Sequence, residues 1–421
     1  MESVLKYGKS TVTLRIPDHN VAGVILPKEL PGLADPQAAV AAALAQPTGT
    51  PPLLELLKAK RPARIAVVVN DITRPTPYNA MLPPLLATFD AAGIKPEQVL
   101  FVVATGIHRG HTDQENREIF GAEVVDRYRF ISHDCTGELA QIGRLSDGTD
   151  LVINKEVAEA DFIITTGMIN LHYFAGYSGG RKSILPGIAG KSLIKHNHSY
   201  MAHPKAGMGR YKDNPVHHIM LESARMVGVD FILNVVTNFH REVVQVVAGD
   251  VEAAWLEGVQ TCGSMSVVPL AEQADVAICS PGGYPKDLDV YQTQKAIEGA
   301  DYAVKPGGTI VVVAECREGL GGEATFEEWM REAKTLDEII ERFNHHFELG
   351  GHKAYAMAKT LKQKEVIFVS SLAPETVKLL FCRHAATLEE AMAYVAAKHG
   401  PDYKALILPQ AAVVLPVVGE Q

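Results

Sequence analysis

Residues 170–183, with the sequence NLHYFAGYSGGRKS, combine a histidine, three glycines within five residues and a lysine in one short stretch. Because glycine has no side chain, the backbone N–H groups of such a stretch can approach an anion closely, and we expect it to bind a phosphate. Its match to the Walker motif of nucleotide triphosphatases is poor. Arg181 stands where that motif has its second glycine, and Pro186 interrupts the helix that should follow Lys182.

Polar residues also follow two other apolar runs. Residues 64–69, 99–104 and 162–166 are runs of the kind found in parallel strands that are buried on both faces. Asp71 and Arg74 follow the first run, His108 the second and His172 the third. The carboxyl ends of parallel strands meet at one edge of a sheet, where ligands collect in open α/β folds. We therefore expect these side chains to share one site.

The segments between the strands predict helices. Residues 78–92 read as a helix that ends at Gly93, and Thr112 with Glu115 forms a capping box for the next helix. Strand and helix patterns alternate again from residue 275 to residue 408. This predicts an α/β fold with two α/β domains and parallel-type sheets, divided as residues 1–268 and 269–408. A final apolar strand within residues 409–421 is expected to return to the first domain.

The composition excludes several classes of partner. The 421 residues carry 40 Lys and Arg against 49 Asp and Glu, a net charge of −9, which is unsuited to binding nucleic acid. The sequence has neither the apolar core of a signal peptide at its start nor an apolar run long enough to span a membrane, so we expect a cytoplasmic protein. Its five cysteines are scattered, and we expect them to be reduced.

The residue types by themselves allow more than one chemistry. Histidines exchange protons near neutral pH and bind divalent metals, and Arg74 at the mouth of a helix can hold a carboxylate or a phosphate. One interpretation is a zinc-dependent hydrolase that uses His172, His196 and His198. Another is a phosphate-binding module without catalytic activity.

Five segments taken together resemble the motifs of one family. They read DITRPTP at 71–77, TGIHR at 105–109, GYSGGRKSILPG at 176–187, HNH at 196–198 and YQTQK at 291–295. In this order, over most of the chain, they are similar to the nickel-pincer-dependent lactate racemase family. The resemblance implies two α/β domains with the active site between them. It also implies a racemase or epimerase that interconverts the stereoisomers of a 2-hydroxy acid by reversible hydride transfer.

The resemblance further implies a cofactor, the nickel-pincer nucleotide, which is a pyridinium mononucleotide with thioamide and thiocarboxylate arms, covalently attached through Lys182. His198 would bind the nickel, and His108 and His172 would be the paired acid and base. The residues expected to contact the cofactor are Lys182, Asp71, Thr73, Arg74, Gly176, Ser178, Gly179 and Gly180. The substrate would be held by Arg74, Tyr291, Gln292 and Lys295.

The partners that the resemblance implies are a small 2-hydroxy acid and the enzymes that make the cofactor. Lactate-specific members carry a tryptophan in the pocket wall of the second domain, near where this chain reads GGHKAY at residues 350–355. The two tryptophans of this chain, Trp255 and Trp329, lie elsewhere in the sequence. This departure leaves the substrate open between lactate, a bulkier or more polar 2-hydroxy acid, and a sugar acid.

Overall fold

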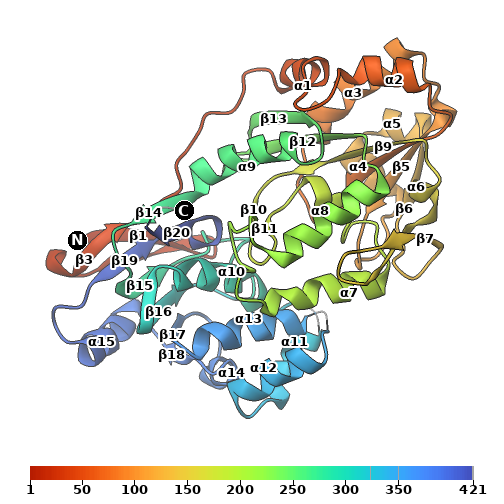
Figure 1. Cartoon of the computed structure of the whole chain (residues 1–421). Coiled ribbons are helices and arrows are strands. Elements are labelled where there is room, and N and C mark those ends of the chain that lie inside the picture. The colour runs from red at the N-terminus through yellow and green to blue at the C-terminus, as the bar shows by residue number, and fades with distance from the viewer. Residues whose placement is uncertain (323, 349, 420–421) are drawn as a thin grey trace. The chain divides into compact units, whose positions relative to one another are not determined.

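The structure is a computed structural model that describes residues 1–322, 324–348 and 350–419 (Figure 1). The chain divides into two compact units, Glu29–Met265 and Met1–Lys28 with Ser266–Gln421. We call the first the central unit and the second the terminal unit, because the second combines both ends of the chain.

The sheet of the central unit is parallel except at one edge, where the last strand runs antiparallel to its neighbour. Its strands, in spatial order, are β13 (Val243–Gly249), β12 (Phe231–Thr237), β9 (Phe162–Met168), β4 (Ile65–Asn70), β5 (Val99–Ala104) and β6 (Arg129–Ser132). Every residue of β9 and all but the last of β4 are buried, which explains the uninterrupted apolar runs in the sequence. The predicted parallel sheet is confirmed.

Helices and two small hairpins connect these strands. The helices are α1 (Pro36–Ala45), α2 (Leu53–Lys60), α3 (Tyr78–Ala92), α4 (Asp113–Phe120), α5 (Ala122–Arg127), α6 (Lys155–Ala158), α7 (Lys191–Ser199), α8 (Pro215–Val227) and α9 (Ala253–Ser266). The hairpins are β7 (Leu139–Arg144) with β8 (Asp150–Asn154) and β10 (Leu171–His172) with β11 (Gly176–Tyr177). A short 3-10 turn, η3 (Gly180–Ser183), follows β11.

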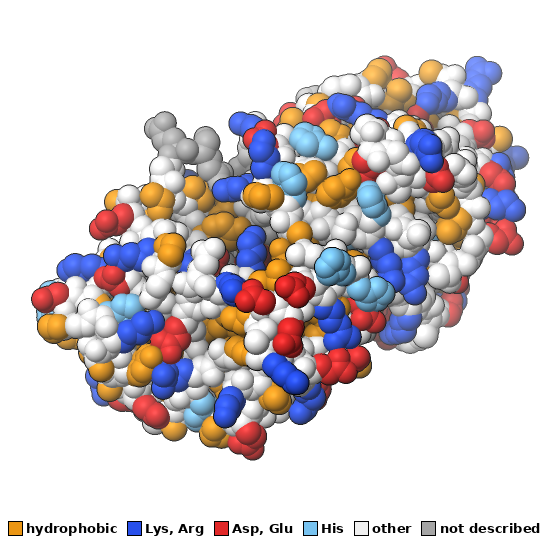
Figure 2. Space-filling view, turned by 60° about the horizontal axis from the view of Figure 1, so that its bottom comes forward, with side chains coloured by type: hydrophobic (Ala, Val, Ile, Leu, Met, Phe, Trp, Pro, Cys, Tyr) orange, Lys and Arg blue, Asp and Glu red, His pale blue; other side chains and the backbone are white. Residues whose placement is uncertain are grey.

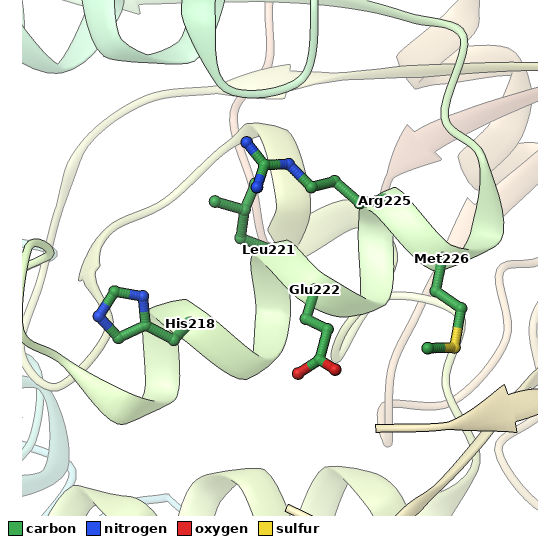
Figure 3. Close-up of a pocket in the computed structure, with 5 residues that line it drawn as sticks. All are labelled: His218, Leu221, Glu222, Arg225 and Met226. Atoms are coloured by element: carbon green, nitrogen blue, oxygen red, sulfur yellow. The ribbon is translucent and has the colours of Figure 1, made fainter. Parts of the chain in front are cut away.

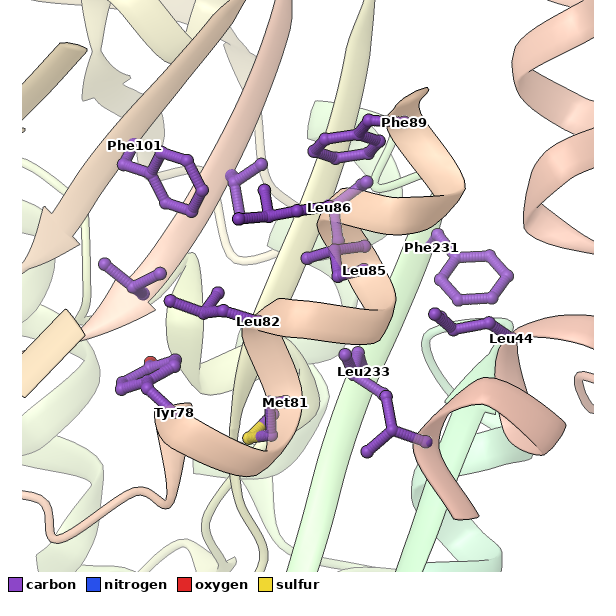
Figure 4. Packing of buried hydrophobic residues seen from close by; sticks show 14 of the residues in the cluster. Leu44, Tyr78, Met81, Leu82, Leu85, Leu86, Phe89, Phe101, Phe231 and Leu233 are labelled. Carbon is purple, nitrogen blue, oxygen red and sulfur yellow. The ribbon is translucent and has the colours of Figure 1, made fainter. Parts of the chain in front are cut away.

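A hydrophobic core lies between α3 and the sheet, as Figure 4 shows. Leu82, Leu85 and Phe89 of α3 are buried in one cluster with Phe101 of β5 and Phe231 of β12. Because α3 connects β4 to β5, this packing holds the carboxyl end of β4 and the loop that follows it on a rigid support.

The helix ends follow the predicted local signals. α3 ends at Gly93, which adopts a left-handed conformation with φ +75°. The capping box at the start of α4 is also confirmed: the Glu115 N–H donates to Thr112 Oγ1 at 3.2 Å, and the Thr112 N–H donates to a Glu115 carboxylate oxygen at 2.8 Å. Pro83 within α3 has no N–H for the Asn79 carbonyl, and Nε2 of Gln37 on α1 donates to it instead, at 3.1 Å.

The terminal unit has its own sheet, in which all the strands are parallel. In spatial order they are β18 (Arg383–Ala385), β17 (Glu365–Val369), β16 (Val304–Val313), β15 (Ala274–Cys279), β19 (Ala405–Leu408) and β3 (Val21–Val24). The helices between them are α10 (Val290–Asp301), α11 (Ala324–Glu332), α12 (Leu336–His345), α13 (Gly351–Leu361), α14 (Pro374–Leu379) and α15 (Leu388–His399). The predicted alternation of strands and helices in this part of the chain is confirmed.

The division of the chain differs from the predicted one at its start. Residues 1–28 were predicted to belong to a first domain of residues 1–268, but they belong to the terminal unit. The hairpin of β1 (Glu2–Tyr7) and β2 (Ser10–Arg15) buries Leu5 and Leu14 in a core with Val276 of β15. β3 then pairs with β19 at the edge of the terminal sheet. Burial of these apolar side chains fixes the segment there.

The last strand also differs from the prediction. β20 (Leu415–Val418) pairs in parallel with β14 (Val267–Leu270), and both belong to the terminal unit. The preceding segment packs on α10, where Gly299 has no Cβ and the carbonyl oxygen of Ala411 comes within 2.1 Å of the position that a Cβ would occupy. Residues 420 and 421 of the predicted strand lie outside the described residues.

No helix among the described residues has the length and hydropathy that a membrane crossing requires. On the face shown in Figure 2, basic and acidic side chains are interspersed, without a broad basic surface of the kind that binds nucleic acid.

We predict that Leu14→Ala lowers the free energy of unfolding of the terminal unit by about 2–5 kcal/mol, because Leu14 is only 1% exposed in its core. The two tryptophans allow this to be measured, since Trp255 lies in the central unit and Trp329 in the terminal unit. In a Trp255→Phe background, denaturation followed by Trp329 fluorescence should show the lower free energy of unfolding that Leu14→Ala causes. In a Trp329→Phe background, the Trp255 signal should be unaffected.

The matched control is Thr11→Ala, an exposed position on the same hairpin, which should change neither transition. A loss confined to the transition reported by Trp255 would contradict the assignment of the first 28 residues.

Candidate active site

Three parallel strands of the central unit end at the same edge of its sheet, and predicted site residues follow each of them. β4 pairs with β5 on one side and with β9 on the other. Asp71 follows β4 directly, His108 lies in the turn after β5, and His172 belongs to β10 just after β9. The structure therefore brings these three loops to one edge of the sheet, as their sequence positions predicted.

Asp71 and His108 form a close pair. The Oδ2 atom of Asp71 lies 2.6 Å from Nδ1 of His108, and the Thr73 hydroxyl donates to Oδ1 of Asp71, also at 2.6 Å. Burial opposes the charged form of Asp71, but the hydrogen bonds from His108 and Thr73 and the charge of Arg74 outweigh it, so its pKa lies below the ordinary value. The carboxylate accepts the Nδ1 proton of His108, which leaves Nε2 of that ring to accept a proton from elsewhere.

Three further predicted residues surround one aromatic ring, that of Phe174. The ring of His172 lies edge-on to it at a centroid distance of 4.6 Å, and the ring of His198 lies at 5.0 Å. The amine of Lys182 lies 5.6 Å from the same centroid. The sequence alone did not indicate this role for Phe174, because an aromatic residue between polar ones most often belongs to a hydrophobic core.

The side chains around Phe174 are driven toward their neutral forms. Burial lowers the pKa of His172 well below its ordinary value, and the charges of Lys182 and Arg74 lower it further. Burial also lowers the pKa of Lys182, with Arg74 and Arg181 adding to the effect. The pKa of His198 falls to about 3 through burial and the charge of Lys182. A neutral imidazole can bind a metal or accept a proton, and a neutral amine is a nucleophile.

Arg74 connects the Asp71–His108 pair electrostatically with the residues around Phe174. Its charge contributes to the lowered pKa values of Asp71, His172 and Lys182, and its side chain is exposed. One of its terminal nitrogens lies 3.4 Å from the Thr73 hydroxyl. An exposed guanidinium in this position can bind a carboxylate.

The glycines of the 170–183 loop are required by packing within the protein. A Cβ on Gly176 would lie 2.2 Å from the carbonyl oxygen of Arg210, one on Gly180 would lie 2.9 Å from the Trp255 ring, and one on Gly179 would lie 2.7 Å from Ile169. All three glycines have positive φ angles.

Hydrogen bonds within the protein also use several polar groups of this loop. The N–H of Gly180 donates to Oδ1 of Asn234 at 2.7 Å, and the N–H of Lys182 donates to the Gly179 carbonyl at 3.1 Å. The Ser178 hydroxyl donates to the Met168 carbonyl and accepts from the Asn170 N–H, both at 2.9 Å. These groups hold the loop in shape, so they give no independent support to phosphate binding by it.

The loop is supported from behind by Arg181 and Trp255. Arg181 is fully buried, its guanidinium carbon lies 4.0 Å from the centroid of the Trp255 ring, and it donates to the Ala175 carbonyl at 2.9 Å. The indole N–H of Trp255 donates to the Ser178 carbonyl at 2.8 Å, and His217 stacks on the same indole. Sequence reasoning noticed Arg181 only as a departure from the Walker motif.

His196 does not join this group. Its Nε2 atom lies 2.9 Å from a carboxylate oxygen of Asp147. His196 and His198 are two residues apart on α7, so their side chains lie on different faces of that helix. Among the described residues, no three His, Cys, Asp or Glu side chains are grouped so that they could hold a metal ion by themselves. A zinc site made of His172, His196 and His198 is therefore not supported.

The remaining predicted residues lie on the first turns of α10 in the terminal unit. Asp289 caps this helix by accepting the Gln292 N–H at 2.7 Å, and the amine of Lys295 donates to Oε1 of Gln292, also at 2.7 Å. The amine of Lys353 on α13 lies 5.3 Å from the centroid of the Tyr291 ring.

A tryptophan does lie beside residues 350–355, although it is distant in sequence. A Cβ on Gly351 would come within 2.6 Å of the Trp329 ring, which is 1% exposed. This contact could not be read from the spacing of the two segments along the chain.

A groove along α8 contains none of the predicted site residues. Figure 3 shows its lining residues, which are His218, Leu221, Glu222, Arg225 and Met226. Glu222 accepts hydrogen bonds from the N–H and hydroxyl of Ser146, and Arg225 is paired with Glu252. Its charged groups are thus used in surface contacts.

We predict that Asp71→Asn destabilises the central unit most above about pH 4, the ordinary pKa of aspartate. Because the pKa of Asp71 is lowered in the folded state, its charged form contributes stability that is present above the unfolded pKa and is lost as the pH falls through the folded pKa. Denaturation curves can be measured at a series of pH values by Trp255 fluorescence in a Trp329→Phe background. The free energies of unfolding of the parent protein and of Asp71→Asn should become equal as the pH is lowered.

The control is Asp213→Asn at an exposed position, for which we expect little difference at any pH. If Asp71→Asn matched the parent protein at pH 6, the stabilising role of the Asp71–His108 pair would be refuted.

Comparisons with known proteins find matches over nearly the whole chain. The family model described as lactate racemase N-terminal domain matches residues 7–209, and that described as lactate racemase C-terminal domain matches residues 270–416. Curated lactate racemases from Thermoanaerobacterium thermosaccharolyticum and Lactiplantibacillus plantarum are each 35% identical to this chain over 422 residues, covering 98% of this chain and 98% of each relative.

Solved structures are similar as well. The lactate racemase apoprotein from Thermoanaerobacterium thermosaccharolyticum has a TM-score of 0.91 and 34% identity, and the match covers 100% of both chains. A protein from Thermotoga maritima has a TM-score of 0.64 and 18% identity, covers 92% of this chain and 99% of its own, and shows a shared fold alone. From the two family models and the relatives that match over nearly their whole length, we conclude that this chain belongs to the lactate racemase family and is a racemase-type isomerase.

Proposed function

We propose that this protein interconverts the enantiomers of lactate, or of a closely related 2-hydroxy acid, with a nickel-pincer nucleotide attached through Lys182. The observation that supports this most is the grouping of His172, Lys182 and His198 about the Phe174 ring. The relatives named lactate racemase support the substrate class.

The residues around Phe174 suit such a cofactor. His198 has the lowered pKa of an imidazole that stays neutral and able to bind a divalent metal, and Lys182 has the lowered pKa of an amine that can form a covalent bond. Lys182 would be the tether and His198 the nickel ligand. The residues that would lie around the cofactor are Asp71, Thr73, Arg74, Gly176, Ser178, Gly179 and Gly180. When bound, the cofactor would supply an acceptor for the hydrogen on the substrate Cα and return that hydrogen to either face.

The two catalytic histidines have opposite tautomers, which suits them to opposite roles. Asp71 accepts the Nδ1 proton of His108, so Nε2 of His108 can take the proton of the substrate hydroxyl. Nδ1 of His172 instead accepts the Ala175 N–H at 3.3 Å, so the neutral His172 ring carries its proton on Nε2 and can donate a hydrogen bond to the substrate oxygen. Transfer of a proton from His172 to that oxygen would need the doubly protonated ring, which then returns to the neutral form. In one direction neutral His108 would act as the base and doubly protonated His172 as the acid, and in the other direction the protonation states and the roles would be exchanged.

The substrate carboxylate would be held by cations and an amide. Arg74 would supply one of these donors, and the resemblance to the family assigns Tyr291, Gln292 and Lys295 to the same role. Charge-assisted hydrogen bonds to the carboxylate would hold the planar 2-oxo acid in place while its other end turns. The oxygen on C2 would remain accessible to the two histidines.

We predict that deuterium on Cα of one lactate enantiomer is largely retained in the other. Neither histidine removes the Cα hydrogen in this proposal, so that hydrogen does not exchange with water. The test is mass spectrometry of the product formed in ordinary water by cofactor-loaded enzyme. His108→Asn should lower kcat by about 10²–10⁴ without loss of label from the residual product. Complete exchange of the label with solvent would refute the proposed reaction.

We predict that Lys182→Ala abolishes covalent attachment of the cofactor. After expression together with the cofactor-synthesis enzymes, intact-protein mass spectrometry should find an adduct on the wild type and none on Lys182→Ala. The matched control is Lys191→Ala, which removes an exposed lysine of α7 and should still carry the adduct. An adduct on Lys182→Ala would place the tether at another residue.

A further inference from the structure

His111 lies between β5 and α4 and makes hydrogen bonds with both of its ring nitrogens. Its Nε2 atom accepts the backbone N–H of Ile72 at 2.8 Å, and its Nδ1 atom lies 2.9 Å from Oδ1 of Asn116 on α4. Ile72 stands between Asp71 and Thr73 in the loop of residues 71–77. His111 therefore holds the loop that carries the proposed carboxylate-binding Arg74.

The tautomer of His111 follows from its partners. A backbone N–H can only donate, so Nε2 of His111 is the nitrogen without a proton. The proton of the neutral ring is then on Nδ1, where the side-chain carbonyl of Asn116 accepts it. The ring is also held by its surroundings, because it stacks on Phe120 at a centroid distance of 6.3 Å and its own backbone N–H donates to the Ser132 hydroxyl at 2.9 Å.

The 71–77 loop is anchored to the His108–His111 segment at two points. One is the Asp71–His108 pair and the other is the bond between Ile72 and His111. The hydrogen bonds from the N–H groups of Arg74 and Thr76 go to carbonyls inside the loop and do not anchor it. Loss of the His111 contact therefore removes one of the loop's two contacts with this segment, while the Thr76 hydroxyl still donates to Oδ1 of Asn70 on β4 at 3.0 Å.

We propose that His111 is a positioning residue, and that uptake of a second proton by its ring releases the 71–77 loop from its substrate-binding arrangement. Histidine is the side chain whose protonation ordinarily falls between pH 5 and pH 8. In the doubly protonated ring Nε2 becomes a donor that faces the donor N–H of Ile72, so the hydrogen bond is lost. The effect on substrate binding rests on the proposed role of Arg74, whereas the effect on the loop does not.

The charged groups around His111 are largely paired with one another. Ionisable residues lie on the adjoining loop, on the segment of His111 with α4, and directly after β6. They are Asp71, Arg74, His108, Arg109, Asp113, Glu115, Arg117, Glu118, His133 and Asp134. Asp71 is paired with His108, Arg109 with Glu115, and Asp113 with Arg117. His133 is 2% exposed and hydrogen-bonded to the Ala189 carbonyl. The carboxylate closest in sequence to Ile72 is thus already engaged.

Amide hydrogen exchange of the cofactor-free protein, read at Ile72 from pH 8 to pH 5, tests the proposal. The protection factor is corrected for the intrinsic pH dependence of exchange. In the wild type it should fall by roughly fivefold to tenfold toward pH 5, as expected for the loss of one hydrogen bond. His111→Gln keeps an acceptor near the position of Nε2 that does not titrate, so protection should be the same at both ends of the range.

His111→Met fills similar space without an acceptor and should show low protection at every pH. The amides of β4 serve as an internal control and should not differ among the three proteins. Equal protection of Ile72 in the wild type and in His111→Met at pH 8 would overturn the proposal. So would a fall in protection toward pH 5 that persists in His111→Gln.

A kinetic measurement separates this proposal from the proposed function. With cofactor-loaded enzyme and lactate, His111→Met should raise KM several-fold with a smaller effect on kcat, and His111→Gln should restore KM at neutral pH. If the loaded wild type does not racemise lactate, the proposed function fails while the exchange result still decides the role of His111. An unchanged KM in His111→Met, despite loss of Ile72 protection, would refute the link to substrate binding.

Discussion

The candidate site depends on one buried cation. Arg181 lies wholly inside the central unit, stacked on the Trp255 ring and bonded to the Ala175 carbonyl. A guanidinium removed from water is costly unless an aromatic face and hydrogen-bond acceptors replace the lost hydration. Here the Trp255 ring and the Ala175 carbonyl replace part of it, although Nε of Arg181 has no hydrogen-bond partner among the described residues. These contacts bind Arg181 to the loop that carries His172 and Lys182. Burial is the main reason why the pKa of Lys182 is lowered, and the charges of Arg74 and Arg181 add to it, so the residue that holds the loop in shape also contributes to the ionisation of its lysine.

Much of the fold could be predicted because buried parallel strands leave a strong local signal. The apolar runs at 64–69, 99–104 and 162–166 became β4, β5 and β9, with ends that differ by two residues at most. Gly93 and the Thr112–Glu115 capping box marked helix ends through chemistry that acts within one turn. The approach of Asp71, His108 and His172 to one another followed from the same rule, since each comes after a strand of a parallel sheet.

What the sequence did not reveal depends on contacts between distant segments. The pairing of β3 with β19 has no local signature, so the first 28 residues were placed with the wrong unit. The glycines of the 170–183 loop were predicted to bind an anion. The structure shows instead that glycine is required there because the Arg210 carbonyl and the Trp255 ring leave no room for a Cβ. From the sequence alone, Phe174 would be expected in a hydrophobic core and Arg181 at the surface. Only the fold shows that Phe174 contacts Lys182 and that Arg181 contacts Trp255. The resemblance identified residue types and their order, but it could not identify the supports behind them.

The terminal unit is assembled from both ends of the chain, and this has a consequence for biosynthesis. β3 leaves the ribosome early, whereas β19, its partner in the sheet, is among the last segments to be made. The central unit is continuous in sequence, so it can fold while translation proceeds. The β1–β2 hairpin has to wait at least until β15 has been made, with apolar Leu5 and Leu14 uncovered in the meantime. Nascent chains are therefore expected to expose this hairpin to chaperones while the central unit is being made.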